Sequence, residues 1–215
     1  MGDLDVRVRD LIAATGFGVV AGTDWLFRDL TLDVTSGQCL AVTGPNGTGK
    51  STILHCLYGM RPPGEGTVTV CGARPDERSS AFRRSVAVLL DDSALFDELS
   101  PRQHLELLFG SFPGASPPDD LVADWLVPAG LGHRVDVAAG QLSAGQRRRL
   151  LLLGALARPH DLVLLDEPER ALDTAGLDWL AGLVNADTEA GAAAVLATHS
   201  RVLVDACADL VLDLG

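Results

Sequence analysis

The sequence lacks long apolar runs, and this shortage argues against a membrane-spanning chain. A helix that crosses a bilayer needs about 18 or more consecutive apolar residues. The densest apolar stretch, Leu150–Ala157, is far shorter than that. The segment Met1–Asp10 carries charges throughout, so we also expect no signal peptide. If the protein acts at a membrane, we expect it to act from the side, through a partner and without direct membrane insertion.

Basic residues and paired cysteines are also scarce. The 17 basic residues are outnumbered by 29 acidic ones, and the formal net charge is −12. A nucleic-acid-binding face needs a basic footprint, so we expect no nucleic acid partner. The cysteines show no C-x-x-C pair and no zinc spacing, which favours reduced, buried thiols of a cytosolic protein over metal ligands; they are Cys39, Cys56, Cys71 and Cys207. The 215 residues, 47% of them hydrophobic, suffice for one sizeable globular domain.

Lysine is the rarest charged residue, and Lys50 is its only instance among the 17 basic residues. Lysine presents a compact charge where arginine presents a planar fork, so Lys50 indicates a narrow cradle for an ammonium group. It lies in a G-x-x-x-x-G-K-[ST] pattern, the phosphate-binding loop of nucleotide triphosphatases, formed by Gly44, Pro45, Asn46, Gly47, Thr48, Gly49, Lys50, Ser51 and Thr52.

The chemistry of this loop suits a nucleotide phosphate. Its glycines let backbone N–H groups wrap a β-phosphate, Lys50 can reach the β- and γ-phosphates, and Ser51 can offer its hydroxyl to Mg²⁺. An apolar strand at Cys39–Thr43 precedes the loop and a helix at Ser51–Tyr58 follows it. This context favours a phosphate site over a glycine-rich turn with an incidental lysine.

A second candidate site follows another apolar strand. Leu162–Leu165 is followed directly by Asp166 and Glu167. A buried strand that ends in aspartate can deliver a hard oxygen ligand to Mg²⁺ beside the phosphates. Glu167 is placed to accept a proton from a water that attacks the γ-phosphorus. An ordinary strand with an acidic end is the alternative, but the presence of the glycine loop favours the functional interpretation.

Further motifs resemble those of the ATP-binding cassette (ABC) ATPases. Leu142–Gln146 is similar to the signature motif of that family, with Ala144 where glycine is most usual. Ala171–Asp173 resembles its D-loop, and Thr198 with His199 resembles its switch region. The motifs stand in the family's order along nearly the whole chain. The resemblance implies an α/β fold, a P-loop NTPase core of the ABC type with a small antiparallel β region and an inserted helical subdomain.

The resemblance also implies a mechanism with ATP and Mg²⁺ as cofactors. Two such subunits, identical or different, associate head to tail with ATP between them. Ser143, Gly145 and Gln146 of one subunit contact the nucleotide held by the glycine loop of the other. His199 would hold the γ-phosphate and position water, and Asp173 would help to couple the two sites. From the residues alone, Ser143 can also be a helix N-cap, and His199 a buried histidine at a strand end.

The sequence departs from the family pattern at several positions. Asp91 stands where glutamine is usual; its carboxylate can ligate Mg²⁺, directly or through water, or repel the γ-phosphate and slow hydrolysis. For the aromatic residue that stacks on adenine, Phe17 is the first candidate and Trp25 the second, with core packing as the alternative. Arg170 stands where a small residue is common. We interpret the three arginines at 147–149 as a solvated helix face that pairs with carboxylates.

The expected elements divide a single domain, residues 1–215, into two parts. About 1–91 and 142–215 form the nucleotide-binding α/β core, and about 92–141 form the helical subdomain, with a Pro/Gly-rich loop at Phe112–Pro118. We expect no internal repeat and no accessory domain after the last strand. Besides the elements named above, periodicity predicts strands at Leu30–Val34, Thr67–Cys71, Val86–Leu90, Ala193–Thr198 and Leu210–Leu214, and helices at Ala144–Ala157, Ala175–Val184 and Val202–Ala206.

Together these features predict an ATP-hydrolysing subunit that powers an ABC transporter through a separate membrane permease. The permease would dock near Asp91 and the helical subdomain, and the subunit would be cytoplasmic, peripheral on the inner face of the cell membrane. The short length resembles small exporter-type ATPases, including the haem-exporter kind. Two alternatives are a soluble ABC ATPase of cluster assembly or cell division, and a regulatory module that binds nucleotide without hydrolysis. The intact Glu167 argues against the second.

Overall fold

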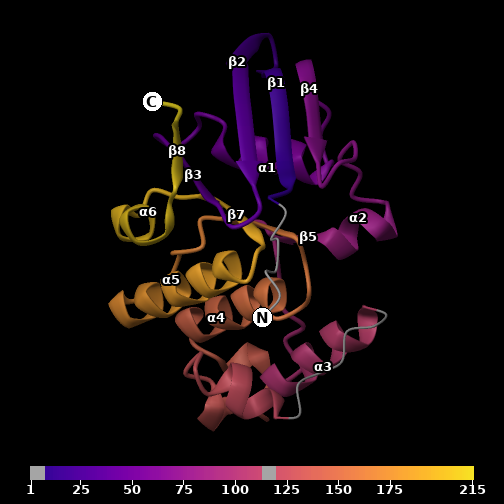
Figure 1. The fold of residues 1–215 in the computed structure, drawn as a ribbon. Helices are drawn as coiled ribbons and strands as arrows, with labels where there is room; N and C mark the ends of the chain where they lie inside the picture. Colours follow the sequence, from indigo (N-terminus) through magenta and orange to yellow (C-terminus); the bar gives the residue numbers. More distant parts are fainter. Residues whose placement is uncertain (1–7, 113–119) are drawn as a thin grey trace, which may run out of the picture.

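Two β-sheets organise the computed structural model, which describes residues 8–112 and 120–215 (Figure 1). An antiparallel sheet has the order β2-β1-β4, from β1 (Asp10–Ala21), β2 (Asp24–Thr35) and β4 (Glu65–Val70). The other sheet has the order β5-β6-β7-β3-β8, and every neighbouring pair in it is parallel. Its strands are β3 (Cys39–Thr43), β5 (Val86–Leu89), β6 (Leu162–Asp166), β7 (Ala193–Ala197) and β8 (Leu210–Asp213).

Helices cover both faces of the parallel sheet, as buried parallel strands require. Between the two sheets lies α1 (Lys50–Tyr58), whose Ile53, Leu54 and Leu57 pack with side chains of both sheets (Figure 1). The opposite face of the parallel sheet forms a second apolar cluster with three further helices. These are α4 (Ala144–Leu156), α5 (Thr174–Glu189) and α6 (Arg201–Cys207); a short helix, α2 (Ser80–Ser85), precedes β5.

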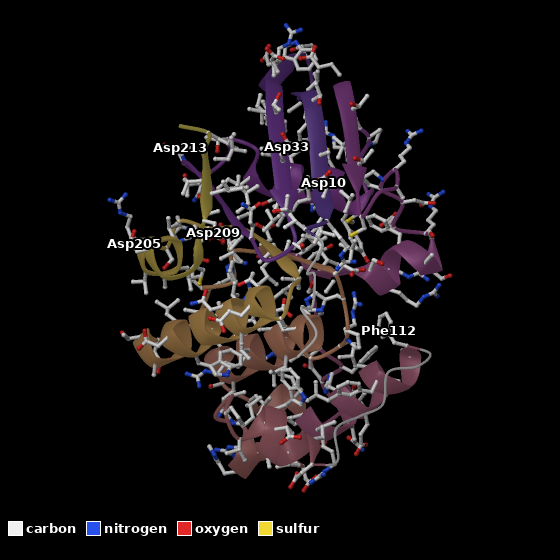
Figure 2. All side chains as sticks on the ribbon, viewed as in Figure 1. Asp10, Asp33, Phe112, Asp205, Asp209 and Asp213 are labelled. Carbon is white, nitrogen blue, oxygen red and sulfur yellow. The ribbon has the colours of Figure 1, made fainter. Side chains whose placement is uncertain are left out.

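The edge strand β8 fixes β3, which leads directly into the glycine loop. The backbone N–H of Cys39 donates to the Asp209 carboxylate at 2.8 Å, and the Thr43 hydroxyl donates to Asp213 at 3.2 Å. Figure 2 labels both aspartates, one at each end of β8. The strand that positions the loop is therefore held at its beginning and at its end.

The segment between β5 and α4 is helical and has its own core. It contains α3 (Pro101–Ser111) and three short helices, η1 (Val122–Leu126), η2 (Gly132–Arg134) and η3 (Ala139–Gln141). Their apolar side chains pack against Leu150 and Leu153 of α4. The Arg158 guanidinium lies 4.4 Å from the ring centre of Phe112, labelled in Figure 2. The Pro/Gly-rich loop after Phe112 lies outside the described residues, and no described helix is long and apolar enough to cross a membrane.

The predicted mixed α/β fold is confirmed, but two elements were missed. No strand was expected at β1, because a bulge interrupts its alternation: the register against β2 shifts between Ala14 and Phe17, where Gly16 has a φ of +59°. Helix α2 has only six residues, too few for a visible period. It begins where the Ser79 hydroxyl accepts a hydrogen bond from the Phe82 N–H at 3.3 Å.

Candidate functional site

Four chain segments meet at the carboxyl edge of the parallel sheet, the usual ligand-binding edge of such sheets. The glycine loop follows β3, and Asp166 with Glu167 ends β6. Asp91 follows β5 by two residues, and Thr198 with His199 follows β7. Because β5, β6, β7 and β3 are consecutive neighbours in the sheet, these separate sequence motifs become one surface.

The glycine loop holds the Lys50 ammonium in a narrow cradle. Lys50 is 6% exposed, and its Nζ donates to the carbonyl oxygens of Gly44 at 2.8 Å and Pro45 at 3.0 Å. Gly49, directly before α1, has a φ of +106°, and a Cβ there would lie 3.1 Å from the Phe27 ring. Glycine is therefore required at this turn by both backbone conformation and space. The N-terminus of α1 then faces the loop, an arrangement that favours a bound anion.

A cavity of about 220 Å³ opens at this loop and brings most predicted phosphate contacts together. Its walls come from the loop, from β2 and from the end of β6; they are Leu26, Asn46, Gly47, Gly49, Lys50, Ser51, Thr52 and Glu167. Of these, only Leu26 was not a candidate. It follows Trp25 in β2, where an irregularity at Asp29, with a φ of +53°, interrupts the alternation of the strand, so no periodic signal indicated Leu26.

The prediction that Phe17 stacks on adenine is wrong in this structure. Phe17 is 0% exposed and packs edge-to-face with Phe27, with ring centres 5.1 Å apart, so neither face of its ring is open to a base. Trp25, the second candidate, is 40% exposed and lies beneath the Arg28 guanidinium. Neither aromatic residue lines the loop cavity, whereas Leu26 does. The bulged β1, which sequence periodicity missed, explains why Phe17 turns into the core.

Ser51 and Asp166 place two oxygen ligands side by side. The Ser51 hydroxyl donates to Asp166 Oδ1 at 3.1 Å, and Asp166 is 1% exposed. Burial raises the pKa of the Asp166 carboxyl; the Ser51 hydrogen bond opposes this, while the charges of Glu167 and Asp91 add to it. Such a buried, uncompensated carboxylate beside a hydroxyl suits a hard divalent cation. Among the described residues, no three His, Cys, Asp or Glu side chains form a ready-made metal cluster, so water and phosphate oxygens would complete the ligand set.

The raised pKa of Asp166 predicts a pH-dependent stability difference. Its ionised form is disfavoured by folding, so its favourable contribution is complete below pH 3.8 and is lost as pH rises through the raised pKa. At pH 7 without nucleotide, we expect Asp166→Asn to melt about 2–4 °C above the wild type, the shift that ~1 kcal/mol causes in a domain of this size. Thermal melts from pH 4 upward should show this advantage growing with pH.

The matched control is Asp205→Asn, an exposed position on α6 labelled in Figure 2. It should change the melting temperature little at any pH. An Asp166→Asn protein that melts below the wild type at pH 7 would contradict the burial argument.

Arg148 holds the turn that carries Glu167. Glu167 has a left-handed backbone, with φ of +42°, which is uncommon for a residue with a side chain. The Arg148 guanidinium, 7% exposed, donates to the carbonyl oxygens of Asp166 at 2.7 Å, Glu167 at 2.5 Å and Pro168 at 3.3 Å. These three bonds compensate for burying the guanidinium and fix the turn.

The interpretation of residues 147–149 as a solvated face is therefore wrong for Arg148. It fits its two neighbours better: Arg147 pairs with Asp97 at 2.7 Å and Arg149 with Asp173 at 2.9 Å. Sequence periodicity could not separate them, because three consecutive helical residues point in three directions.

Glu169 is a candidate site residue that no sequence motif indicated. Its Oε1 accepts from the Thr198 hydroxyl at 2.7 Å and from the His199 N–H at 3.0 Å, and it lies 3.3 Å from His199 Nδ1. The Glu169 side chain is 9% exposed, whereas that of His199 is 60% exposed. The backbone of His199 is thus fixed by Glu169, while its imidazole ring is exposed to solvent. The alternative of a buried histidine does not apply.

Asp91 does not lie against Ser51 and Asp166 but pairs with Arg170. The Arg170 guanidinium bonds the Asp91 carboxylate through Nη1 and lies 3.6 Å from Glu167 Oε2 through Nη2. The three charged groups therefore form a row, carboxylate–guanidinium–carboxylate. The contact between Asp91 and a metal stays a prediction, and Arg170 already bonds one oxygen of this carboxylate.

The signature residues line a different cavity from the glycine loop. This second cavity, of about 410 Å³, is formed by Gly130, Ser143, Gly145, Gln146, Arg149, Ala171 and Asp173. Ser143 is the N-cap of α4: its hydroxyl accepts from the Gln146 N–H, and the Gln146 side chain accepts from the Ser143 N–H at 3.0 Å. Asp173 caps α5, and the Gly176 N–H and Arg149 lower the pKa of its carboxyl. No residue is shared with the loop cavity.

Known proteins are similar to this chain in sequence. A family profile described as "ABC transporter" matches residues 27–170. The cytochrome c biogenesis ATP-binding export protein CcmA of Dechloromonas aromatica (strain RCB) is 33% identical over 95% of this chain and 100% of its own length. The SkfA peptide export ATP-binding protein SkfE of Bacillus subtilis (strain 168) is 32% identical over 85% of this chain and 76% of its own.

Solved structures share the fold. One described as the ATP binding subunit of an ABC transporter has a TM-score of 0.81 at 24% identity, covering 94% of this chain and 85% of that one. A bacterial Atm1-family ABC exporter with ATP bound has a TM-score of 0.80 at 22% identity, covering 99% of this chain and 38% of that one. The glycine loop, the acidic end of β6 and the sequence relatives all indicate the same family. The chain belongs to the ABC transporter family, as an ATP-binding subunit with ATPase activity.

Proposed function

We propose that this protein is the ATP-hydrolysing subunit of an exporter-type ABC transporter and works with a separate membrane permease. The observation that carries the proposal is the meeting of the glycine loop, Asp166–Glu167 and His199 at one sheet edge. Two relatives named as export ATP-binding proteins match most of this chain and most of their own lengths, which supports the exporter type. The subunit would lie on the cytoplasmic face of the membrane, bound to the permease.

The proposed roles follow the geometry of the loop cavity. Lys50 and the loop N–H groups hold the phosphates of ATP, and Ser51 with Asp166 would hold Mg²⁺, whose charge, when bound, offsets that of the phosphates. Glu167 accepts a proton from the attacking water, which forms its bond to the γ-phosphorus as the bond to ADP breaks. His199, open at its ring, contacts the γ-phosphate.

We further propose that two subunits complete each site. Ser143 and Gly145 line a cavity separate from the loop cavity of the same chain. Ser143 begins α4, whose N-terminal N–H groups favour an anion, so this surface suits a phosphate that another subunit presents. A head-to-tail dimer, of identical or different subunits, would place each signature surface over the partner's loop.

The permease would dock in an apolar cavity beside the helical subdomain. This cavity, of about 380 Å³, lies between β5, α3 and α4, and Val88, Leu95, Phe96, Leu107 and Leu150 are among its walls. Phe96 is 62% exposed and Leu107 is 50% exposed. Apolar side chains of this size gathered at one exposed groove favour a protein partner.

Purification from membranes tests the transporter assignment. We expect a tagged chain, isolated from membranes of its own cells in mild detergent, to carry a multi-span membrane protein in stoichiometric amount. Phe96→Glu should reduce that recovery at least several-fold, because it places a charge in the apolar groove. Val202→Glu, a matched control on α6 where Val202 is 46% exposed, should leave recovery unchanged. An active ATPase without any integral membrane partner would instead favour a soluble ABC ATPase.

A further inference from the structure

Two departures from the family pattern meet in space. Asp91 stands at a position where glutamine is usual, and Arg170 at one where a small residue is common. They are 79 residues apart in the sequence, yet the Arg170 guanidinium forms an ion pair with the Asp91 carboxylate. A turn fixes the base of Arg170, because its backbone N–H donates to the Glu167 carbonyl oxygen at 3.0 Å.

The charge of Asp91 would be unfavourable without Arg170. Asp91, Asp166 and Glu167 follow neighbouring strands at the edge that faces the loop cavity, where the polyphosphate of ATP would also bind. A third carboxylate at this edge repels the phosphates and the other two carboxylates. The pair of Asp91 and Arg170 sums to zero charge, as does a glutamine with a small neutral residue.

The pair contributes little to the fold itself. The side chain of Arg170 is 55% exposed and that of Asp91 is 57% exposed, and exposed ion pairs stabilise proteins weakly. A second contact of Arg170 indicates a role at the site instead: its Nη2 lies 3.6 Å from Glu167 Oε2, and Glu167 lines the loop cavity. Arg170 is thus shared between the carboxylate it neutralises and the carboxylate proposed to accept the proton.

We infer that Asp91 and Arg170 are a charge-compensating pair that leaves Glu167 free to accept the proton during hydrolysis. Asp91 anchors the guanidinium, so Arg170 does not form a full ion pair with Glu167. Without Arg170, the free Asp91 carboxylate opposes ATP binding. Without Asp91, the one ion-pair partner that Arg170 retains among the described residues is Glu167, and Arg170 competes with water for that carboxylate. This inference rests on the proposed role of Glu167 and goes beyond it in assigning two residues that balance the charge beside it.

A double-mutant cycle in the purified ATPase tests the pair. Arg170→Gln should raise KM for MgATP roughly tenfold, and Asp91→Gln should lower kcat roughly tenfold, the order expected for a unit charge near a partly exposed site. The double variant Asp91→Gln/Arg170→Gln should return both constants to within about twofold of the wild type, because the charges cancel. A purely structural role would not separate KM from kcat in this way.

The matched control is Arg9→Gln, which removes an arginine from another exposed ion pair, with Asp161 at 2.8 Å and 55% exposure of Arg9. It should leave KM and kcat unchanged. The inference is overturned if the double variant shows the product of the two single effects, if both single variants match the wild type, or if Arg9→Gln raises KM as much as Arg170→Gln. Glu167→Gln is measured in parallel, since activity that survives it refutes the proposed role of Glu167, whatever the pair does.

Discussion

Replacing Glu167 with glutamine should reduce ATP hydrolysis by about 10²–10⁴-fold, the usual contribution of a general base. The change keeps the size of the side chain and removes its negative charge and its ability to accept a proton. Because the turn at Glu167 is held through backbone carbonyl oxygens bonded to Arg148, the substitution should leave the fold intact. Single-turnover hydrolysis and equilibrium ATP binding, measured on the same preparation, separate the two effects.

Binding should be retained while hydrolysis is lost. Lys50, Ser51 and the loop N–H groups do not depend on the Glu167 charge, so affinity for ATP should change little or increase. Trapped ATP should then stabilise the proposed dimer, which size-exclusion chromatography with ATP would detect. Glu189→Gln, at the exposed end of α5, is the matched control and should hydrolyse ATP normally. Undiminished turnover in Glu167→Gln would show that another group accepts the proton.

Replacing Lys50 with arginine should weaken ATP binding roughly 10–100-fold although the charge is kept. The ammonium is 6% exposed and donates to two loop carbonyl oxygens at 2.8 and 3.0 Å. A planar guanidinium is wider than this cradle and cannot present one donor to both oxygens and then to a phosphate. Loss of one charge-assisted hydrogen bond costs about 1.5–3 kcal/mol, which corresponds to the stated factor.

Fluorescent nucleotide titration would measure this loss. Arg102→Lys, an exchange in the opposite sense at an exposed ion pair of α3, should not alter affinity. Since Lys50 is the only lysine, amine-directed acylation followed by mass spectrometry gives a second readout. Because the Lys50 side chain is buried, we expect acylation to be slow without ATP and slower still with it. Wild-type affinity in Lys50→Arg would mean that the cradle has no steric selectivity.

Much of the site could be predicted because its motifs are local. The strand, loop and helix around Lys50 are contiguous, so residue types and spacing define them without any distant contact. The apolar runs of β3 and β6 gave their bounds to within one residue for the same reason: buried parallel strands read as short continuous apolar segments. The long α4 and α5 were likewise predicted, although α5 ends later than its apolar period suggested.

Sequence periodicity failed to predict which way a side chain points in two elements, β1 and α4. The bulge in β1 concealed that strand and left Phe17 as a candidate for adenine stacking, whereas packing against Phe27 buries it. Arg148 was grouped with its neighbours, yet the helix turns it toward the carbonyl oxygens that follow β6. In both cases the deciding partner comes from another element, and no pattern within the segment specifies it.

By itself, the sequence determined the glycine loop, the acidic strand end, the order of the motifs and therefore the family. Only the tertiary structure decided which charges are neighbours. Glu169 bonds Thr198 across 29 residues, and Arg170 pairs with Asp91 across 79. The physical reason is that parallel strands return each motif to the same sheet edge through long crossovers. Side chains that are unrelated in sequence then come within a few ångströms, where charge and hydrogen bonding decide what each one does.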